Sequence, residues 1–219
     1  MRTGVSDAVW LALVDFRYAL SVSAVSIPAR AQAPVAAFVQ QNIDRGVAVL
    51  KDKSLGDAGR HEKIGEMLAE VFDTRKMALF MLGNLRETAA ASDLDVYAEA
   101  YRAFSIASYE SQLGSYGGQS LKVTGSVERT PGDYIVEAVV VDPALPNDPT
   151  PLPIAFRVVA ERDGKFAVVD ASIAGIWLGL AQRAEFGAYL RQHGSSVTTL
   201  GAHLQEVTAG LSASSGASH

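Results

Sequence analysis

Residues 154–172, IAFRVVAERDGKFAVVDAS, decide the fold class of this chain. They hold two runs of largely alternating apolar residues, Ile154–Glu161 and Lys165–Ser172. Between the runs lies Asp163-Gly164, a dipeptide that is typical of a tight β-hairpin turn. Strands that are joined by such a short turn pair antiparallel. This stretch therefore predicts a β-hairpin.

A similar pattern precedes this hairpin. The runs Leu121–Arg129 and Tyr134–Val141 flank a Pro-Gly-Asp turn at 131–133, which makes four predicted strands in all. Apolar residues recur at helical spacing on both sides of this region, from Pro34 onward and again after Gly175. Helices, an antiparallel meander and further helices are typical of an α+β domain with its helices packed on the sheet.

The sequence divides into three parts. An apolar run of ten residues, Tyr18–Ile27, precedes Ala31-Gln32-Ala33, which fits the small-x-small cleavage site of a secretory signal. The run is too short to span a bilayer, which needs about 20 residues. We predict a cleaved signal peptide at 1–33, one domain at 34–211 and a disordered tail at 212–219. An N-terminal core helix is the alternative interpretation of the apolar run.

Composition excludes several functions. The net charge is −5 and no run of Lys or Arg occurs, which argues against nucleic acid as a partner. Without cysteine, the chain has no disulfides, thiol catalysis or Cys-ligated zinc. The four histidines do not pair at metal-ligand spacing, so we expect neither a metal nor a cofactor.

The predicted strands each have one apolar face. Ile154, Phe156 and Val158 share such a face on the third strand, and Val136 and Val140 share one on the second. Ordinary core packing under the helices explains any one of these residues. Together they also fit an apolar pocket enclosed between the four-stranded sheet and the helical layer.

Several motifs, in their order and spacing, resemble those of the MlaC (toluene-tolerance) family. Phe72-Asp73, Met77-Ala78 and Leu82-Gly83 are similar to its F-D…M-A…L-G helix pair. The strongest similarity is to its pattern G-x-W-x-V-x-D-V-x-x-E-G-I-S…R-x-x-F, which corresponds here to GKFAVVD at 164–170, IAGI at 173–176, Arg183 and Phe186. The resemblance covers residues 34–193.

The chain departs from the family pattern at several positions. Phe166 stands in place of the usual Trp, Ala174 in place of Glu, and Trp177 in place of Ser. These changes are compatible with the family's HpnM branch, which is associated with hopanoids, rigid triterpenoids that differ from diacyl lipids.

The resemblance implies a periplasmic lipid carrier that is not an enzyme. Such a carrier shuttles phospholipid or hopanoid between the inner and outer membranes as the soluble component of an ABC lipid-transport system. Its implied partners are an inner-membrane ABC transporter with a membrane-anchored substrate-binding subunit, or an RND-type transporter, and an outer-membrane lipoprotein complex.

The expected lipid contacts are apolar or aromatic side chains on the predicted helices and strands. They are Phe72, Met77, Phe80, Phe104, Tyr109, Leu113, Tyr116, Val136, Val140, Phe156, Val158, Ile173, Ile176 and Trp177. We also expect a structural ion pair between Asp170 and Arg183. Two other functions stay open: an isomerase or dehydratase with a cone-shaped pocket, in which Asp170 is the general base, and a non-catalytic structural adaptor.

Overall fold

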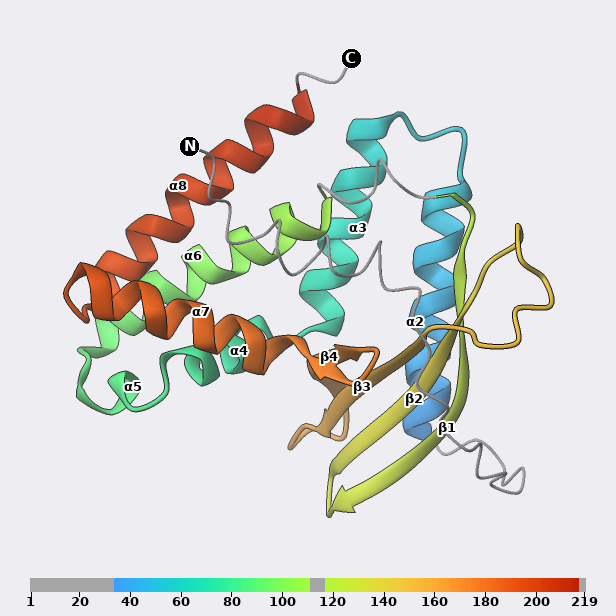
Figure 1. Ribbon diagram of the computed structural model, residues 1–219, viewed down its shortest axis with the longest axis horizontal. Coiled ribbons are helices and arrows are strands. Elements are labelled where there is room, and N and C mark those ends of the chain that lie inside the picture. The colour runs from blue at the N-terminus through green and yellow to red at the C-terminus, as the bar shows by residue number, and fades with distance from the viewer. Residues whose placement is uncertain (1–33, 111–116, 217–219) are drawn as a thin grey trace.

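A computed structural model describes residues 34–110 and 117–216, with helices at both ends of this range and strands in the middle (Figure 1). The elements in chain order are α2 (Pro34–Lys51), α3 (Asp57–Val71), α4 (Thr74–Leu82), α5 (Leu85–Thr88), α6 (Ala91–Glu110), β1 (Ser120–Thr130), β2 (Asp133–Val141), β3 (Pro153–Ala160), β4 (Phe166–Ile173), β5 (Ile176–Trp177), α7 (Leu178–His193) and α8 (Val197–Gly216). Among the described helices, none is both long enough and apolar enough to cross a membrane.

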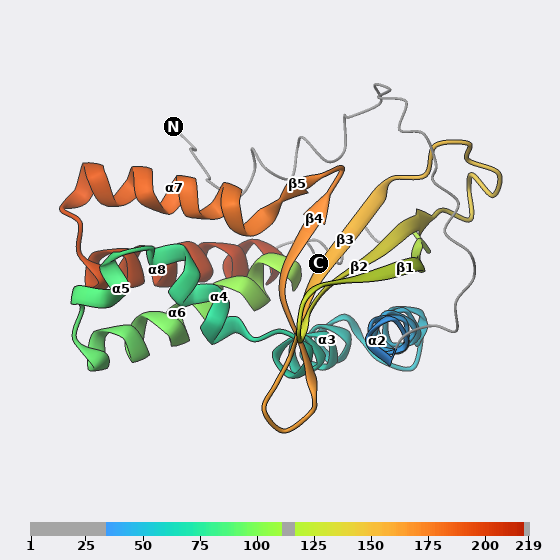
Figure 2. The same ribbon diagram turned by 90° about the horizontal axis from the view of Figure 1, so that it is seen from below.

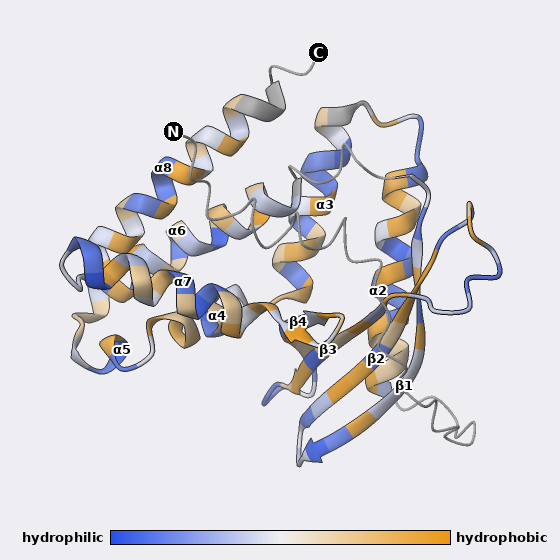
Figure 3. Cartoon of the chain, in the orientation of Figure 1, coloured by the Kyte–Doolittle hydropathy of each residue, from blue (hydrophilic) through white to orange (hydrophobic). Residues whose placement is uncertain are grey.

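The strands form one antiparallel sheet in the order β1-β2-β3-β4-β5. The α+β class is confirmed, and each of the four predicted strands ends within one residue of its predicted bounds. Apolar and polar residues alternate along β1 and β2, as Figure 3 shows. This alternation has a period of two, because successive side chains of a strand point to opposite faces of the sheet.

The prediction of four strands is incomplete, because β5 adds a fifth. It is two residues long and pairs with the end of β4. Ala174 and Gly175 join the two strands with φ of 51° and 82°. Asn-Gly is the usual sequence for such a turn, whereas Ala is strained at positive φ. Because Ala174 occupies the position where Asn is usual, the sequence did not predict this hairpin.

The helices form two groups. Helices α2 and α3 lie under the sheet, and α4, α6, α7 and α8 pack on one another in a bundle beside it (Figure 2). Helix α8 continues to Gly216, so the backbone at 212–216, predicted to begin a disordered tail, is helical. This segment, Ser-Ala-Ser-Ser-Gly, contains Ala, the best helix former, and Ser, which disfavours a helix only moderately. Residues 217–219 lie outside the described residues.

Two hydrophobic cores follow from this arrangement. The core of the bundle includes Tyr101, Phe104 and Leu200, and the core between the sheet and α2 includes Val136 and Val158. The junction between α3 and α4 connects them. There Phe72 forms a bridge with Val168 of β4, and the Asp73 N–H donates to the Val168 carbonyl oxygen over 3.0 Å.

Helix α2 is also attached to the edge of the sheet. The Gln40 side chain donates to the Leu121 carbonyl oxygen over 3.3 Å and accepts from the Val123 N–H over 2.8 Å. These backbone groups belong to β1, which has a strand neighbour on one side only. Gln40 thus binds edge groups that are otherwise without a partner strand.

Candidate functional site

A cavity of about 340 Å³ lies between α2, α3 and the sheet. We call it the apolar cavity. Its lining consists of Val39, Asn42, Ile43, Gly46, Val47 and Leu50 of α2, Ile64, Met67, Leu68 and Val71 of α3, Phe72, and Gln119, Ser120, Leu121, Val140, Phe156 and Val168 of the sheet and its entry. None of these lining residues is ionisable. The cavity can therefore solvate hydrocarbon but offers no charge to an ionic group.

The few polar side chains in this lining include two that are bonded to the protein. The Asn42 amide donates to the Phe38 carbonyl oxygen over 3.0 Å. Gln119 accepts from the Gly117 N–H over 2.9 Å, at the start of the sheet. These amides serve the backbone, and apolar contact is what the cavity has to offer a ligand.

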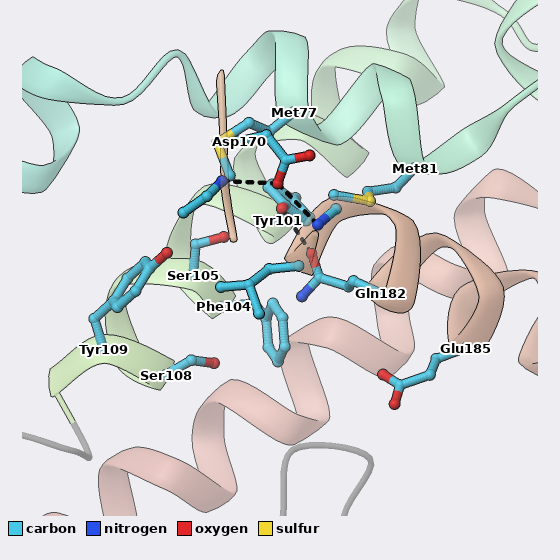
Figure 4. Close-up of a pocket in the computed structure, with 13 residues that line it drawn as sticks. Met77, Met81, Tyr101, Phe104, Ser105, Ser108, Tyr109, Asp170, Gln182 and Glu185 are labelled. Atoms are coloured by element: carbon cyan, nitrogen blue, oxygen red, sulfur yellow. Dashed lines mark hydrogen bonds between the residues drawn. The ribbon is translucent and has the colours of Figure 1, made fainter. Parts of the chain in front are cut away.

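A second cavity, of about 90 Å³, lies between α4, α6, β4 and α7. Figure 4 shows its lining, in which polar side chains face one another, and we call it the polar chamber. Met77, Met81, Phe104, Ala171 and Leu178 are its apolar members, and Tyr101, Ser105, Ser108, Tyr109, Asp170, Gly179, Gln182 and Glu185 complete it. The Tyr101 hydroxyl donates to the Gln182 side-chain oxygen over 2.8 Å.

Asp170 connects β4 with the start of α7. Its Oδ1 accepts from the Gly179 N–H over 2.9 Å and from the Ala171 N–H over 2.8 Å. The N-cap position of α7 is Trp177, whose side chain makes no capping bond, so Asp170 performs that role from the adjacent strand. Burial raises the pKa of Asp170, against the opposing effect of the two N–H donors.

Burial raises the pKa of three further groups of the chamber above their usual range. They are Glu185, Tyr101 and Tyr109, and the pKa of Tyr109 rises to about 12. The Tyr109 hydroxyl is therefore neutral near pH 7. Its ring packs on that of Phe72, with 5.9 Å between the ring centroids. Because Phe72 lines the apolar cavity and Tyr109 the polar chamber, this ring pair lies between the two.

The predicted ion pair between Asp170 and Arg183 is wrong. The Arg183 guanidinium instead lies over the Phe80 ring, 5.0 Å from its centroid. It also occupies space beside Gly83, where an added Cβ would lie 2.7 Å from a guanidinium nitrogen. Arg183 thus turns toward α4, while backbone N–H groups bind the Asp170 carboxylate.

The predicted lipid contacts separate into several groups. Phe72, Val140 and Phe156 line the apolar cavity. Met77, Phe104 and Tyr109 line the polar chamber instead.

The other predicted contacts that belong to the described residues line neither cavity. Val136 and Val158 are core residues with 0% exposure, and Phe80 packs under Arg183. Ile173, Ile176 and Trp177 belong to the β4–β5 hairpin, where Ile176 is 59% exposed. Leu113 and Tyr116 lie outside the described residues.

Sequence reasoning missed most of the wall formed by α2 and α3. Ile43, Val47 and Met67 are examples, and their helical spacing was visible in the sequence. Such an apolar stripe shows that a helix faces the interior. It does not distinguish side chains that fill the interior from those that border a cavity.

Helices packed on an antiparallel sheet, with a cavity between them that has no ionisable lining residue, define an α+β protein with an apolar cavity. The chain belongs to the MlaC protein family, whose model matches residues 40–206. No match was found among curated protein sequences.

A solved structure has a similar fold. It is that of the phospholipid-binding protein from Ralstonia solanacearum, determined in complex with a phospholipid. The two chains are 21% identical, and the alignment covers 82% of this chain and 99% of the other, with a TM-score of 0.68. At this identity the similarity establishes a shared fold.

Proposed function

We propose that the protein is a periplasmic lipid carrier that holds the apolar part of a phospholipid or hopanoid in the apolar cavity. The main support for this proposal is the apolar cavity itself, which has a volume of about 340 Å³ and no ionisable lining residue. This volume is near the lower end of the roughly 300–1,000 Å³ of ligand pockets. Membership of the MlaC family and the fold shared with a phospholipid-binding protein support the proposal.

The energetics favour binding of the tails. A diacyl lipid exposes on the order of 30 methylenes, and at about 0.8 kcal/mol each roughly 20 kcal/mol opposes its passage through water. A carrier must replace the lost apolar contact, and Val, Leu, Ile, Met and Phe side chains supply it here. A charged head group would cost several kcal/mol inside such a lining, so it stays near the surface.

The hydrogen bonds of Asp170 favour the carrier function over the alternative enzymatic function. Asp170 is the candidate general base of the alternative function. The hydrogen bonds that its Oδ1 accepts cap α7 and connect it to β4, which explains the residue through structure alone.

In the cell, we propose that the carrier is the soluble component of an ABC lipid-transport system between the two membranes. Its partners would be the inner-membrane transporter, with its anchored substrate-binding subunit or an RND-type protein in its place, and an outer-membrane lipoprotein complex. Export would follow cleavage after Ala33. N-terminal sequencing of periplasmic protein should then begin at Pro34, whereas an intact chain found only in the cytoplasm contradicts export.

The direct test fills the apolar cavity. Val47 lines it, whereas the neighbouring Ala48 on the same helix is exposed. Val47→Trp should abolish most displacement of a bound fluorescent fatty acid, and Ala48→Trp should leave it unchanged. Mass spectrometry of organic extracts from both variants identifies the lipid. Equal binding by two folded variants would place the ligand elsewhere.

A second test separates tail binding from head-group binding. Phe156 lines the cavity, and Phe156→Asp should empty it, because a carboxylate among acyl chains is costly. Glu161→Gln, outside the cavity, is the control. Affinity should depend strongly on chain length, or on replacement of the chains by a fused triterpenoid, and only weakly on salt and head group. Affinity that collapses with salt and ignores chain length would overturn the tail-in arrangement.

A further inference from the structure

The apolar cavity is long and narrow. Its lining along α2 begins at Val39 and ends at Leu50, which spans about 16 Å at 1.5 Å per helical residue. A volume of about 340 Å³ over this length gives a mean cross-section of about 20 Å². Hydrocarbon chains in van der Waals contact lie about 4 to 5 Å apart, so each chain takes about 20 Å². The cross-section therefore matches one extended acyl chain, and two chains side by side would need twice the area.

The volume also limits the number of carbon atoms that the cavity holds. An engineered cavity of roughly 150 Å³ takes benzene, which corresponds to about 25 Å³ for each of the six carbons. At this ratio a cavity of about 340 Å³ holds about 14 carbons. A single acyl chain has this size. A diacyl lipid and a triterpenoid both carry far more carbon than the cavity can enclose.

Contacts between elements hold both helical walls at this distance from the sheet (Figure 2). The Gln40 side chain of α2 is bonded to two backbone groups of β1, at 3.3 and 2.8 Å. After the end of α3, the Asp73 N–H donates to the Val168 carbonyl oxygen of β4 over 3.0 Å. An ion pair of 2.6 Å between Arg45 and Glu70 joins α2 to α3. A second chain would have to push a helix away from the sheet and break such contacts.

The polar chamber does not provide room for a second chain. Its volume is about 90 Å³, and the ring pair of Phe72 and Tyr109 lies between it and the apolar cavity. The chamber lining also includes the carboxyl groups of Asp170 and Glu185. Hydrocarbon in the chamber would take these polar groups out of water without offering them a hydrogen bond, which is costly.

We propose that the apolar cavity takes a single acyl chain, so that the ligand is a monoacyl lipid and not a diacyl lipid or a triterpenoid. A lysophospholipid and a free fatty acid both present one such chain. No lining residue is ionisable, so the polar end of either ligand lies at the surface. This inference rests on the proposed function, because it names the class of ligand for the same cavity.

A chain-length series tests the capacity of the cavity. Saturated fatty acids of about 8 to 20 carbons are used to displace a bound fluorescent fatty acid, and their affinity should rise about fourfold per methylene. The rise should stop at about 14 carbons, because further methylenes stay in water. Leu68→Ala removes three carbons from the lining and should move this break to about 17 carbons. Leu180→Ala, the same change at a position that is 57% exposed, is the matched control and should keep the break of the parent.

Lipid vesicles test the number of chains directly. The protein is equilibrated with vesicles that contain equal amounts of dimyristoyl and monomyristoyl phosphatidylethanolamine. It should extract the monoacyl form in at least about a hundredfold excess, since the second chain of the diacyl form would remain in water. Mass spectrometry of organic extracts from protein purified from cells should show lysophospholipid or fatty acid, and the one that is found identifies the source of the chain.

The outcomes separate this inference from the proposed function. Equal extraction of the two forms, a diacyl lipid or hopanoid recovered from cells, or affinity that still rises beyond about 18 carbons in the parent overturns the single-chain inference. The same holds if folded Leu68→Ala keeps the break of the parent. Each of these results leaves the carrier function intact. A parent protein that binds no lipid in any of these experiments overturns both.

Discussion

The two cores of the molecule are built from side chains of different size. In the helix bundle, Tyr97, Tyr101, Phe104 and Phe186 form a chain of ring contacts with centroid separations of 6.2 to 6.4 Å. Between the sheet and α2, valines dominate the buried positions, and the larger cavity lies there. Rings thus fill the bundle, whereas short side chains leave space beside the sheet. Side-chain size, rather than hydrophobicity, distinguishes the core of the bundle from the wall of the apolar cavity.

The largest effect should come from equivalent truncations in the two regions. Leu200 of α8 has 0% exposure in the bundle, whereas Leu68 of α3 borders the apolar cavity. Leu200→Ala should lower the free energy of unfolding by about 3 kcal/mol, because it opens a new void. Leu68→Ala should cost about 1 kcal/mol, since it enlarges an existing one. Urea unfolding measures both, and equal losses would show that the cavity is filled in solution.

The Asp170 cap offers a second comparison. Asp170→Ala should cost about 1–2 kcal/mol, because it leaves the first N–H groups of α7 without their acceptor. Arg183→Gln affects a different contact, with Phe80. A double-mutant cycle of the two should therefore be additive within about 0.5 kcal/mol. A coupling energy well above this value would indicate that Asp170 and Arg183 do form an ion pair in solution.

Substitution of one helical glycine beside each cavity, Gly46 at the apolar cavity and Gly179 at the polar chamber, should affect stability in opposite directions. A Cβ at Gly46 would meet the flexible end of Met67 at 3.0 Å, whereas one at Gly179 would lie 2.9 Å from the bonded Asp170 carboxylate. Gly46→Ala should be neutral or stabilising by up to about 1 kcal/mol, as Ala favours helix. Gly179→Ala should destabilise by about 1 kcal/mol through the loss of the cap. Thermal unfolding of the two variants measures the difference, and shifts of the same sign contradict it.

The smallest effect concerns Glu185 and has a defined pH dependence. Its pKa is raised in the folded protein by burial, so the unfolded chain loses its proton first as pH rises. Stability then falls above the unfolded value of 4.5 and stays lower once the folded group has ionised. Glu185→Gln should therefore stabilise by a few tenths of a kcal/mol at pH 7 and not at pH 3. Urea unfolding at both pH values tests this, and a gain that is larger at pH 3 reverses the sign.

Sequence patterns predicted the sheet better than the site. Alternation and turn chemistry placed the ends of four strands, because both depend on residues adjacent in the chain. The hairpin at Ala174 was missed because its strained turn lacks the usual residues. The family resemblance was found from the order of motifs, and the family match confirms it.

The cavity wall was harder to predict for a physical reason. Phe156 and Val136 both lie on the apolar face of their strand in the sequence pattern. In the structure, however, Phe156 borders the apolar cavity and Val136 is fully buried. Which side chain meets empty space depends on how far α2 and α3 stand from the sheet. That distance is set by packing between segments remote in sequence, which periodicity does not record.

The hydrogen bonds of Gln40 affect how readily the edge strand β1 can pair with a strand of another molecule. The Gln40 amide donates to one carbonyl oxygen of β1 and accepts from one N–H two residues later, as a peptide unit of a neighbouring strand would. A foreign strand that pairs at this position must first displace that amide and the helix that carries it. The Gln40 side chain thus takes the place that a peptide unit of a sixth strand would occupy. It thereby disfavours intermolecular strand pairing at this part of the edge, and the aggregation that such pairing causes.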